Sequence, residues 1–243
     1  MNGFFDIPSD LQHSYLGLIG LHAKEALLPV LFGLLISLPL GQLCVRFKWL
    51  YAPVLSVTTV LYAIPSLAFF VFLIDYTGAT VTTVMIPLTI YSLVVLVPAI
   101  VDGVRSVPQE TLAAATAMGF GPIRRFVQVQ LPIAVPAIIA GLRVAVVSSI
   151  SLVSVGALIG NQGALGNLLQ DALFYHRTVL AVNSVVTTAV LAIVLDGLLI
   201  LLRIALTPWM PPSRGRARRR ANRSKPASAT PEPAVLALED AVR

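Results

Sequence analysis

Long apolar stretches separated by short polar segments dominate this chain. A helix needs about 20 mainly apolar residues to cross the hydrocarbon core of a bilayer. The apolar segment from Leu11 to Leu21 is too short, and it either lies along the interface or leads into the first span. The pattern predicts an all-α polytopic membrane protein with about five transmembrane helices. Their approximate limits are Ala26 to Val45, Pro53 to Ile74, Thr80 to Val101, Pro132 to Leu152, and Val179 to Leu202.

Prolines recur inside the expected spans. Proline removes a backbone N–H, but neighbouring helices or waters can satisfy the freed carbonyl groups within a membrane protein. Their number favours kinked helices around a pathway over straight anchors. These prolines are Pro29, Pro39, Pro65, Pro87 and Pro98.

Positive charge is distributed unevenly among the connecting segments. Cytoplasmic loops are enriched in Lys and Arg. The segments after the first, third and fifth spans carry most of the basic residues, whereas the opposite side has only Lys24 and Arg177. We therefore expect the N-terminus outside and the C-terminus in the cytoplasm. The basic residues on the expected cytoplasmic side are Arg46, Lys48, Arg105, Arg124, Arg125 and Arg203, followed by a basic tail.

Composition supports a membrane protein, because 57% of the residues are hydrophobic and only 12% are charged. A soluble domain carries about 25% charged residues. The net charge of +6 belongs mostly to residues 213–243, a segment rich in Arg, Ala, Pro and Ser that we expect to be disordered. Its basic cluster, Arg214 to Lys225, either contacts anionic lipid headgroups or is solvated and reinforces topology. No basic face alternates with aromatic residues in the interior, so we expect no nucleic-acid partner.

Catalytic and metal-binding patterns are missing from the sequence. It has no GxxxxGK[ST] run for nucleotide phosphates, no paired carboxylates and no Ser/His/Asp arrangement. Cys44 is the single cysteine, and we expect a small packed or lipid-facing residue. We therefore expect no enzyme activity, no metal and no cofactor. The three histidines, His13, His22 and His176, are scattered.

Two ionisable residues, Arg143 and Asp196, fall within apolar spans. Such residues usually face the bundle interior and form pairs. We favour pairing or snorkelling over contact with a solute. Lys24, Glu25 and Asp75 lie near the outer ends of spans, where we expect them to mark the interface.

Aromatic residues in the second and third spans are candidates for holding a quaternary ammonium ion, which binds to aromatic faces. Such residues are also common on lipid-facing surfaces, so the sequence assigns none of them to a solute site. The candidates are Tyr62, Phe69, Phe70, Phe72 and Tyr91.

The segment between the third and fourth spans has the most specific local pattern. Ser106 and Gln109 have the spacing of a capping box, and Pro108 suits a first helical turn. We expect a helix from Gln109 to Met118, with small residues at Ala113, Ala114, Ala115 and Ala117. Gly119 can adopt the left-handed conformation that ends a helix.

The same segment then continues into a second helix. Gly121 extends the break after Gly119, and Pro122 can open a short helix that runs through Gln130. Leu131 and Pro132 lead back into the membrane. A short helix with small side chains either docks closely on another protein or lies on the membrane as an ordinary interface helix. The residues alone leave both readings open.

This loop resembles the cytoplasmic loop of permeases in binding-protein-dependent ABC importers. The family pattern is Glu-Ala-Ala, three residues, Gly and, after a spacer, Leu-Pro; Ala114, Ala115, Gly119, Leu131 and Pro132 match it. Ala113 stands where the family has glutamate. Glu110 lies one turn earlier and could replace it on the same helix face. The resemblance implies that an ATPase subunit docks on the loop, whose candidate residues are Pro108, Glu110, Ala113, Ala114, Ala115, Gly119, Gly121, Leu131 and Pro132.

The resemblance extends from about His22 to Arg203. IPSLAFFVFL (Ile64 to Leu73) and LPIAVPAIIAGLR (Leu131 to Arg143) resemble the osmoprotectant branch, which imports glycine betaine, choline or carnitine. IGNQGALG (Ile159 to Gly166) is similar to a glycine-rich external segment there. Its glycines fit an external gate or an ordinary loop. They are Gly160, Gly163 and Gly166.

The resemblance implies a type I importer permease with no catalysis of its own. The partners that it implies are an ABC ATPase, a second identical or different permease subunit, an external solute-binding protein and membrane lipid. Its location would be the bacterial cytoplasmic (inner) membrane. The domains are then an external or interfacial segment (1–25), a permease domain (26–212) with a coupling loop (105–131), and the cytoplasmic tail (213–243).

Three alternatives remain from the sequence. A related importer for an amino acid such as methionine shares much of the expected architecture. An ion-coupled secondary transporter usually has internal repeats and midplane charges, and we find no clear repeat. No residue constellation favours a membrane enzyme or assembly factor.

Overall fold

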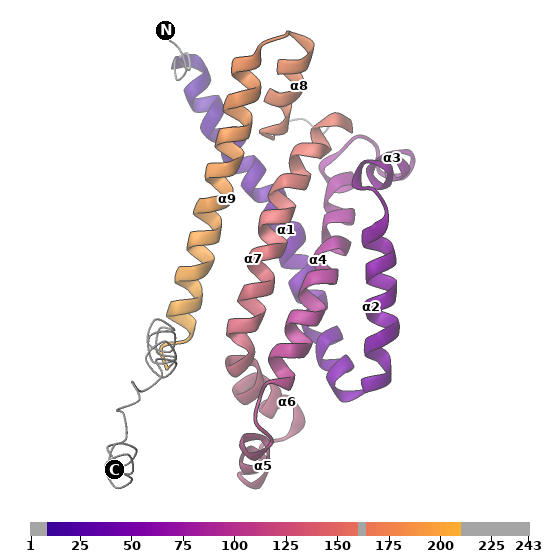
Figure 1. The fold of residues 1–243 in the computed structure, drawn as a ribbon, viewed down its shortest axis with the longest axis vertical. Coiled ribbons are helices and arrows are strands. Elements are labelled where there is room, and N and C mark those ends of the chain that lie inside the picture. Colours follow the sequence, from indigo (N-terminus) through magenta and orange to yellow (C-terminus); the bar gives the residue numbers. More distant parts are fainter. Residues whose placement is uncertain (1–8, 160–163, 210–243) are drawn as a thin grey trace, which may run out of the picture. The chain divides into compact units, whose positions relative to one another are not determined.

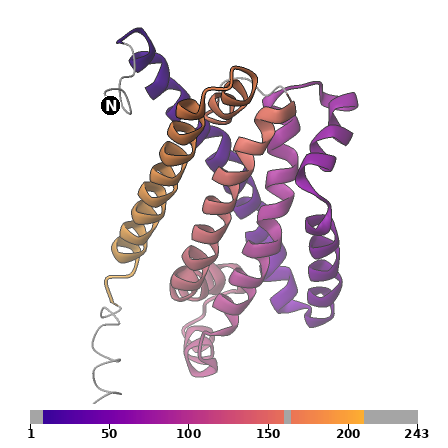
Figure 2. The ribbon, with the colours of Figure 1, turned by 45° about the horizontal axis from the view of Figure 1, so that its top comes forward.

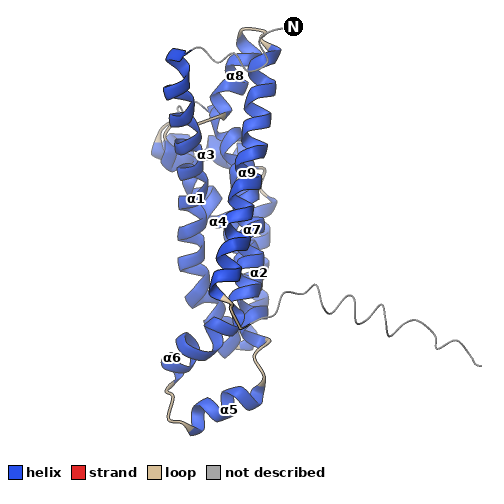
Figure 3. Ribbon diagram, turned by 90° about the vertical axis from the view of Figure 1, so that its left-hand side faces the viewer, coloured by secondary structure: helices blue, strands red, loops and turns tan. Residues whose placement is uncertain are grey.

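The computed structural model describes residues 9–159 and 164–209, which form helices joined by short connections (Figure 1). Contacts divide the chain into Met1–Thr207 and Pro208–Arg243, and only the first unit is considered below. Figure 3 contains no strand among the described residues. The elements are α1 (Ser9–Arg46), α2 (Lys48–Ala63), α3 (Ser66–Thr77), α4 (Val81–Arg105), α5 (Gln109–Ala117), α6 (Pro122–Arg125), the π-helical turn η1 (Phe126–Gln130), α7 (Leu131–Gly156), the 3-10 turn η2 (Ala157–Ile159), α8 (Gly166–Phe174) and α9 (Thr178–Leu206).

Four helical segments in the described residues are long and apolar enough to cross a membrane, and the bent pair α2–α3 makes a fifth if it is counted as one span. This agrees with the expected five. α1 has 38 residues, which at about 1.5 Å per residue is far longer than a bilayer core of about 30 Å. The segment from Leu11 to Leu21 therefore leads into the first span as part of α1.

The expected second span, Pro53 to Ile74, is not one continuous helix. α2 and α3 are bent by 88° at the break between them, and Figure 1 shows α3 nearly end-on while α2 runs lengthwise. The cause is Pro65, because a residue before proline avoids the helical conformation. Ile64 is accordingly extended, with φ −67° and ψ 126°. Its carbonyl accepts a hydrogen bond of 2.8 Å from the Tyr91 hydroxyl of α4.

The other prolines do not interrupt their helices. Pro29 and Pro39 lie within α1, and Pro87 and Pro98 within α4. The expectation that prolines bend the spans thus holds at Pro65, where the helix is interrupted.

α4 and α7 lie side by side with opposite chain directions (Figure 2). Small residues make this contact close. A Cβ atom added at Gly141 would lie 2.5 Å from the Cβ of Ala99, and one at Gly103 would lie 3.0 Å from the Cβ of Ala134. Close backbone approach through small residues is the usual basis of helix association in lipid, where apolar burial gives little preference for protein over lipid.

α1 completes the centre of the bundle. A Cβ atom at Gly41 would lie 2.7 Å from a methyl carbon of Ile100 in α4. Cys44 is buried in a cluster with Val97 and Val101, so it is the packed residue of the two expected alternatives. The core of the described residues is therefore formed mainly by α1, α4 and α7.

The chain path places most basic residues of the loops, though not Arg177, at one end of this bundle, called the basic end below. It comprises the α1–α2 elbow, the C-terminus of α4, α5 and α6, and the C-terminus of α9 (Figure 1). α5 and α6 project beyond the long helices at this end (Figure 3).

Gly141→Ala should destabilise the protein by about 1–3 kcal/mol. The new methyl group would overlap with the Cβ atom of Ala99, which is bonded directly to the backbone and cannot rotate away. The matched control is Gly197→Ala in α9, where nothing lies within 4 Å of the added Cβ. There the higher helix propensity of alanine should stabilise by about 0.5–1 kcal/mol. Thermal unfolding in detergent measures both. A stabilising Gly141→Ala would show that the close α4–α7 contact is not as described.

Candidate functional site

The candidate docking loop, residues 105–131, contains the predicted helix–turn–helix. α5 ends at Ala117, and Gly119 has φ +80°. The Gly119 N–H donates to Thr116 O at 2.9 Å and the Phe120 N–H donates to Ala115 O at 3.1 Å. These two bonds define a Schellman turn. Because a Cβ at Gly119 would meet nothing within 4 Å, glycine is favoured there by backbone conformation rather than by space.

The second predicted helix also begins where expected, with Pro122 in the first turn of α6. It does not end at Gln130, however. α6 passes through the π-helical turn η1 directly into α7, and together they form one span from Pro122 to Ile159. The loop is therefore joined rigidly to α7.

The predicted capping box is wrong. The Ser106 hydroxyl donates to Gly103 O at 2.7 Å and thereby closes α4. Pro108 occupies the N-cap position of α5, and no side chain caps this helix. Ser106 lies at the end of α4 and Gln109 at the start of α5, so the capping-box spacing joins residues of two different helices.

The structure places most of the candidate docking residues on the surface of the loop, and a few within it. Ala115 is buried, with 2% of its surface exposed, and so packs inside the loop. Leu131 and Pro132 are half-buried at the start of α7, where Leu131 packs against the cluster around Ile100 and Ala134. The exposed candidates are Pro108, Glu110, Ala113, Ala114, Gly119 and Gly121.

Side-chain contacts connect the two arms of the loop. Arg125 of α6 donates to the Thr116 hydroxyl of α5 at 2.9 Å. The Arg124 guanidinium lies 4.3 Å from the centroid of the Phe120 ring, and a cation over an aromatic face is attractive. The loop is thus a compact unit.

Apolar side chains at the loop's tip were not among the predicted site residues. Met118 is 67% exposed and Ile123 is 81% exposed. Exposed apolar residues in a projecting element are a signal for a protein or membrane contact. Their positions on either side of the Gly119 turn would have allowed their inclusion from the sequence.

Only part of the predicted external glycine segment can be assessed, because Gly160 and Gly163 lie outside the described residues. Gly166 begins α8 and is buried. A Cβ there would lie 2.6 Å from Ser154 O of α7. The Ser184 hydroxyl of α9 donates to Leu165 O at 2.7 Å, so this glycine lies where α7, α8 and α9 meet.

Arg143 and Asp196 pair with one another, and pairing is one of the two structural roles that the sequence favoured for them. Two charge-assisted hydrogen bonds join the guanidinium of α7 to the carboxylate of α9, at 2.6 and 2.7 Å. The two side chains are 36% and 27% exposed. The arrangement satisfies both charges and connects the two helices, which is a structural role.

Glu25 does not mark the interface as expected, because its side chain is buried at 2% exposure. One turn earlier His22 is also fully buried, and its Nε2 lies 3.0 Å from Ile150 O of α7. The Ser149 hydroxyl donates to Ala26 O at 2.8 Å. The polar start of the expected first span is therefore a packed α1–α7 contact, which no local pattern distinguishes from an interfacial segment.

Three of the candidate aromatic residues lie together. The rings of Tyr62 and Tyr91 meet edge to face with centroids 5.4 Å apart, and Phe69 is 6.1 Å from Tyr91. Tyr62 and Tyr91 line a small crevice of about 10 Å³ with Ser148 and Ser149 of α7. The other two candidates differ in their surroundings. Phe70 is fully buried, and Phe72 is 62% exposed beside Tyr76.

Residues 30–211 match the family model described as the binding-protein-dependent transport system inner membrane component. This match runs from the second half of α1 to the end of α9 and includes the projecting loop. The chain belongs to this family. It is therefore a multi-pass membrane permease component, and transport rather than catalysis is the activity of its family.

Curated relatives agree with this membership. The chain is 35% identical over 192 residues to the osmoprotectant import permease protein OsmW of Salmonella typhimurium, with 77% of this chain and 89% of the relative covered. It is 31% identical over 189 residues to the choline transport system permease protein OpuBD of Bacillus subtilis, with 78% and 84% covered. It is 32% identical over 174 residues to the ergothioneine transport permease/ergothioneine binding protein EgtU of Helicobacter pylori, covering 72% of this chain and 31% of that protein.

The fold is that of a type I ABC importer permease. Inward-facing structures of the MetNI methionine ABC transporter contain a chain that matches with a TM-score of 0.70 and 16% identity, covering 83% of this chain and 100% of that one. A second crystal form gives a TM-score of 0.71 at 18% identity. At this identity the likeness concerns the fold alone.

Asp196→Ala should lower the thermal midpoint, because it leaves Arg143 without its charge-assisted bonds inside an apolar span. The double variant Arg143→Ala/Asp196→Ala should recover part of this loss, since no unpaired charge remains. Thermal unfolding of both singles and the double forms a double-mutant cycle. Additive losses would contradict a structural pair.

Proposed function

We propose that this chain is the membrane-spanning permease of an ATP-driven importer for osmoprotectants of the glycine betaine or choline type. The ATPase is a separate subunit, and an external binding protein delivers the solute. A second copy of the chain or a related permease completes the pathway. The observation that carries the proposal is the compact loop that projects from the closely packed pair α4 and α7.

The chemistry of the loop suits docking on the ATPase. Ala113 and Ala114 are exposed, and their small side chains permit close backbone approach by another protein. Glu110 is exposed in the first turn of α5, three residues before Ala113, so both belong to one face of the helix. We infer that Glu110 supplies the carboxylate that the family pattern has at Ala113. Met118 and Ile123 would add apolar contact beside this face.

The geometry also supports a way for movement of the ATPase to reach the membrane-spanning helices. α5 and α6 are joined by the Schellman turn and the Arg125–Thr116 bond, so a force on α5 moves α6. α6 continues into α7 without a break. Movement of a docked ATPase would therefore reach α4 and α7 as rigid bodies and switch the solute pathway between the two permease subunits from outward- to inward-facing.

The solute class rests on the curated relatives, whose names specify osmoprotectants and choline. Tyr62 adds a physical argument, because its ring is 48% exposed beside the crevice at Ser148. A quaternary ammonium ion binds to such aromatic faces. Methionine rests on fold likeness alone and is the weaker candidate.

The basic end is proposed to face the cytoplasm, in the bacterial inner membrane. The supporting observation is that Arg46, Lys48, Arg105 and Arg203 all lie at this end, as the positive-inside rule requires. The N-terminus would then lie outside and the basic tail, 213–243, in the cytoplasm. The external segment with Gly160, Gly163 and Gly166 would face the binding protein as a gate or docking loop.

Gly119→Asp should reduce ATP-dependent uptake by about tenfold or more while leaving membrane insertion intact, because it places a charge at the centre of the docking turn. The matched control is His176→Asp. His176 has φ 53° and is followed by the Arg177 N–H to Ala172 O bond, so it holds the same place in a Schellman turn at the opposite end. Co-purification of the ATPase should fall for Gly119→Asp and not for His176→Asp. Normal uptake and complex formation by Gly119→Asp would refute docking at this turn.

Reconstitution of the chain into vesicles with its candidate ATPase and binding protein tests the whole proposal. We expect ATP-dependent uptake of radiolabelled glycine betaine or choline that requires all components. Preferential uptake of methionine or ergothioneine would retain the importer mechanism and reject the solute. Uptake by the chain alone, driven by an ion gradient, would reject the ABC assignment in favour of a secondary transporter.

A further inference from the structure

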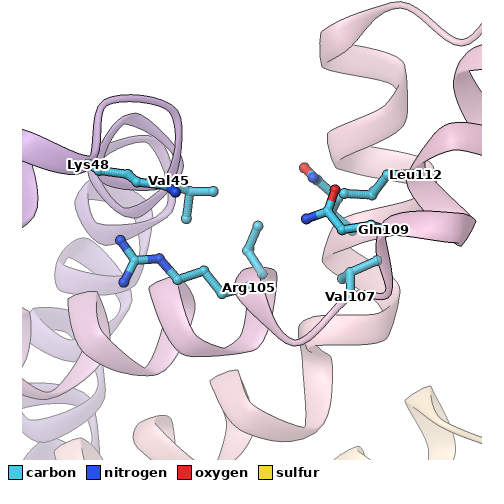
Figure 4. Close-up of a pocket in the computed structure, with 8 residues that line it drawn as sticks. Val45, Lys48, Arg105, Val107, Gln109 and Leu112 are labelled. Atoms are coloured by element: carbon cyan, nitrogen blue, oxygen red, sulfur yellow. The ribbon is translucent and has the colours of Figure 1, made fainter.

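A pocket of about 430 Å³ lies at the basic end between the α1–α2 elbow, the end of α4 and the start of α5. Its polar lining consists of Lys48, Arg105, Gln109 and Gln130, and the remainder is Val and Leu. Figure 4 shows Arg105 extending towards the elbow that carries Lys48, with Gln109 and Leu112 across the space. Three separate parts of the chain line the pocket: residues 45–48, residues 104–112 and Gln130.

The electrostatics of the lining favour an anion. Lys48 and Arg105 contribute two positive charges, and none of the described residues that line the pocket is acidic. Lys48 is also the first residue of α2, whose first turn contains no acidic residue and whose N-cap makes no side-chain hydrogen bond. The positive end of a helix adds to the attraction of an anion.

A buried amide supplies a second and independent indication of a polar ligand. Gln130 is only 6% exposed and lines the pocket. Its amide therefore forms a polar, largely buried part of the lining, and a ligand oxygen in the pocket would accept its N–H.

Exposed aromatic residues beside Lys48 favour a lipid as the source of the anion. Trp49 and Phe47, on either side of Lys48, are 72% and 42% exposed. Exposed aromatic residues next to basic ones are typical of the headgroup level of a bilayer. The apolar part of the lining, including Val45 and Val104, suits the glycerol and upper acyl region of a lipid.

We propose that this pocket binds the phosphate of an anionic phospholipid from the leaflet at the basic end. Lys48 and Arg105 provide the charge, and the amides of Gln109 and Gln130 donate hydrogen bonds. The bound lipid connects the α1–α2 elbow to the first turn of α5, so it fixes the base of the projecting loop. The binding of lipid does not depend on the solute or on ATPase docking.

Binding is measured by native mass spectrometry of the purified full chain, titrated with phosphatidylglycerol or, for comparison, phosphatidylcholine. Lys48→Gln/Arg105→Gln should weaken phosphatidylglycerol binding by about tenfold and leave the weak phosphatidylcholine binding unchanged. The matched control, Arg46→Gln/Arg203→Gln, removes the same charge at the same end but does not line the pocket.

Lys48→Gln alone keeps the test valid if the double variant is unstable. Arg105 lies 5.0 Å from the Tyr51 ring and contributes to packing, whereas Lys48 is exposed. Lys48→Gln should weaken phosphatidylglycerol binding severalfold without changing the thermal midpoint.

Three results would overturn the proposal. Equal loss of lipid in the control pair would indicate general surface attraction. Inorganic phosphate that binds to the chain and displaces phosphatidylglycerol completely would indicate a site for the free anion. Unchanged lipid binding in the double variant, with loss of ATPase co-purification, would assign the pocket to a carboxylate of the ATPase.

Discussion

The close contact between α4 and α7 is the interaction on which the rest of the structure depends. Gly141 against Ala99 and Gly103 against Ala134 bring the two backbones together over much of their length. The chain between them, residues 106–130, consequently leaves and re-enters the bundle at nearly one place. A short segment anchored in this way must project as a compact loop, and its orientation is set by two helices that cannot separate without losing their packing.

The loop could be predicted from sequence because its determinants are local. The Schellman turn needs only a residue that tolerates positive φ after a helix, and Gly119 supplies it. The start of α6 needs only Pro122 after a break. The wrong prediction at Ser106 also comes from local sequence. A serine can cap the start of the next helix or donate its hydroxyl to a carbonyl at the end of the preceding one. Which of these occurs depends on where α4 ends.

Tertiary contacts decided the features that the sequence did not predict. Prolines inside α4 and the Pro65 break are locally similar, but the carbonyl freed at Ile64 has the Tyr91 hydroxyl as its partner. Glu25 and His22 resemble interfacial residues until α7 covers them. Arg143 and Asp196 were each expected to pair or to snorkel, and the fold alone determines that they pair with one another across 53 residues of sequence.

The helices of this protein associate by two different physical means. α1, α4 and α7 rely on close packing, which needs small residues at defined positions and tolerates little change. α9 is mostly apolar and none of its most hydrophobic window is buried within the described part of the chain, so packing against protein gains little over lipid. Ala192, Leu195 and Leu199 of α9 pack against the core. Polar contacts add to this packing: the Arg143–Asp196 pair to α7 and the Ser184–Leu165 bond to the start of α8. Hydrogen bonds and ion pairs are directional. They can therefore fix the position of a helix along its axis where van der Waals packing alone would let it slide. A closely packed centre of α1, α4 and α7, with α9 attached to it through polar contacts, suits a permease in which α4 and α7 move as one body.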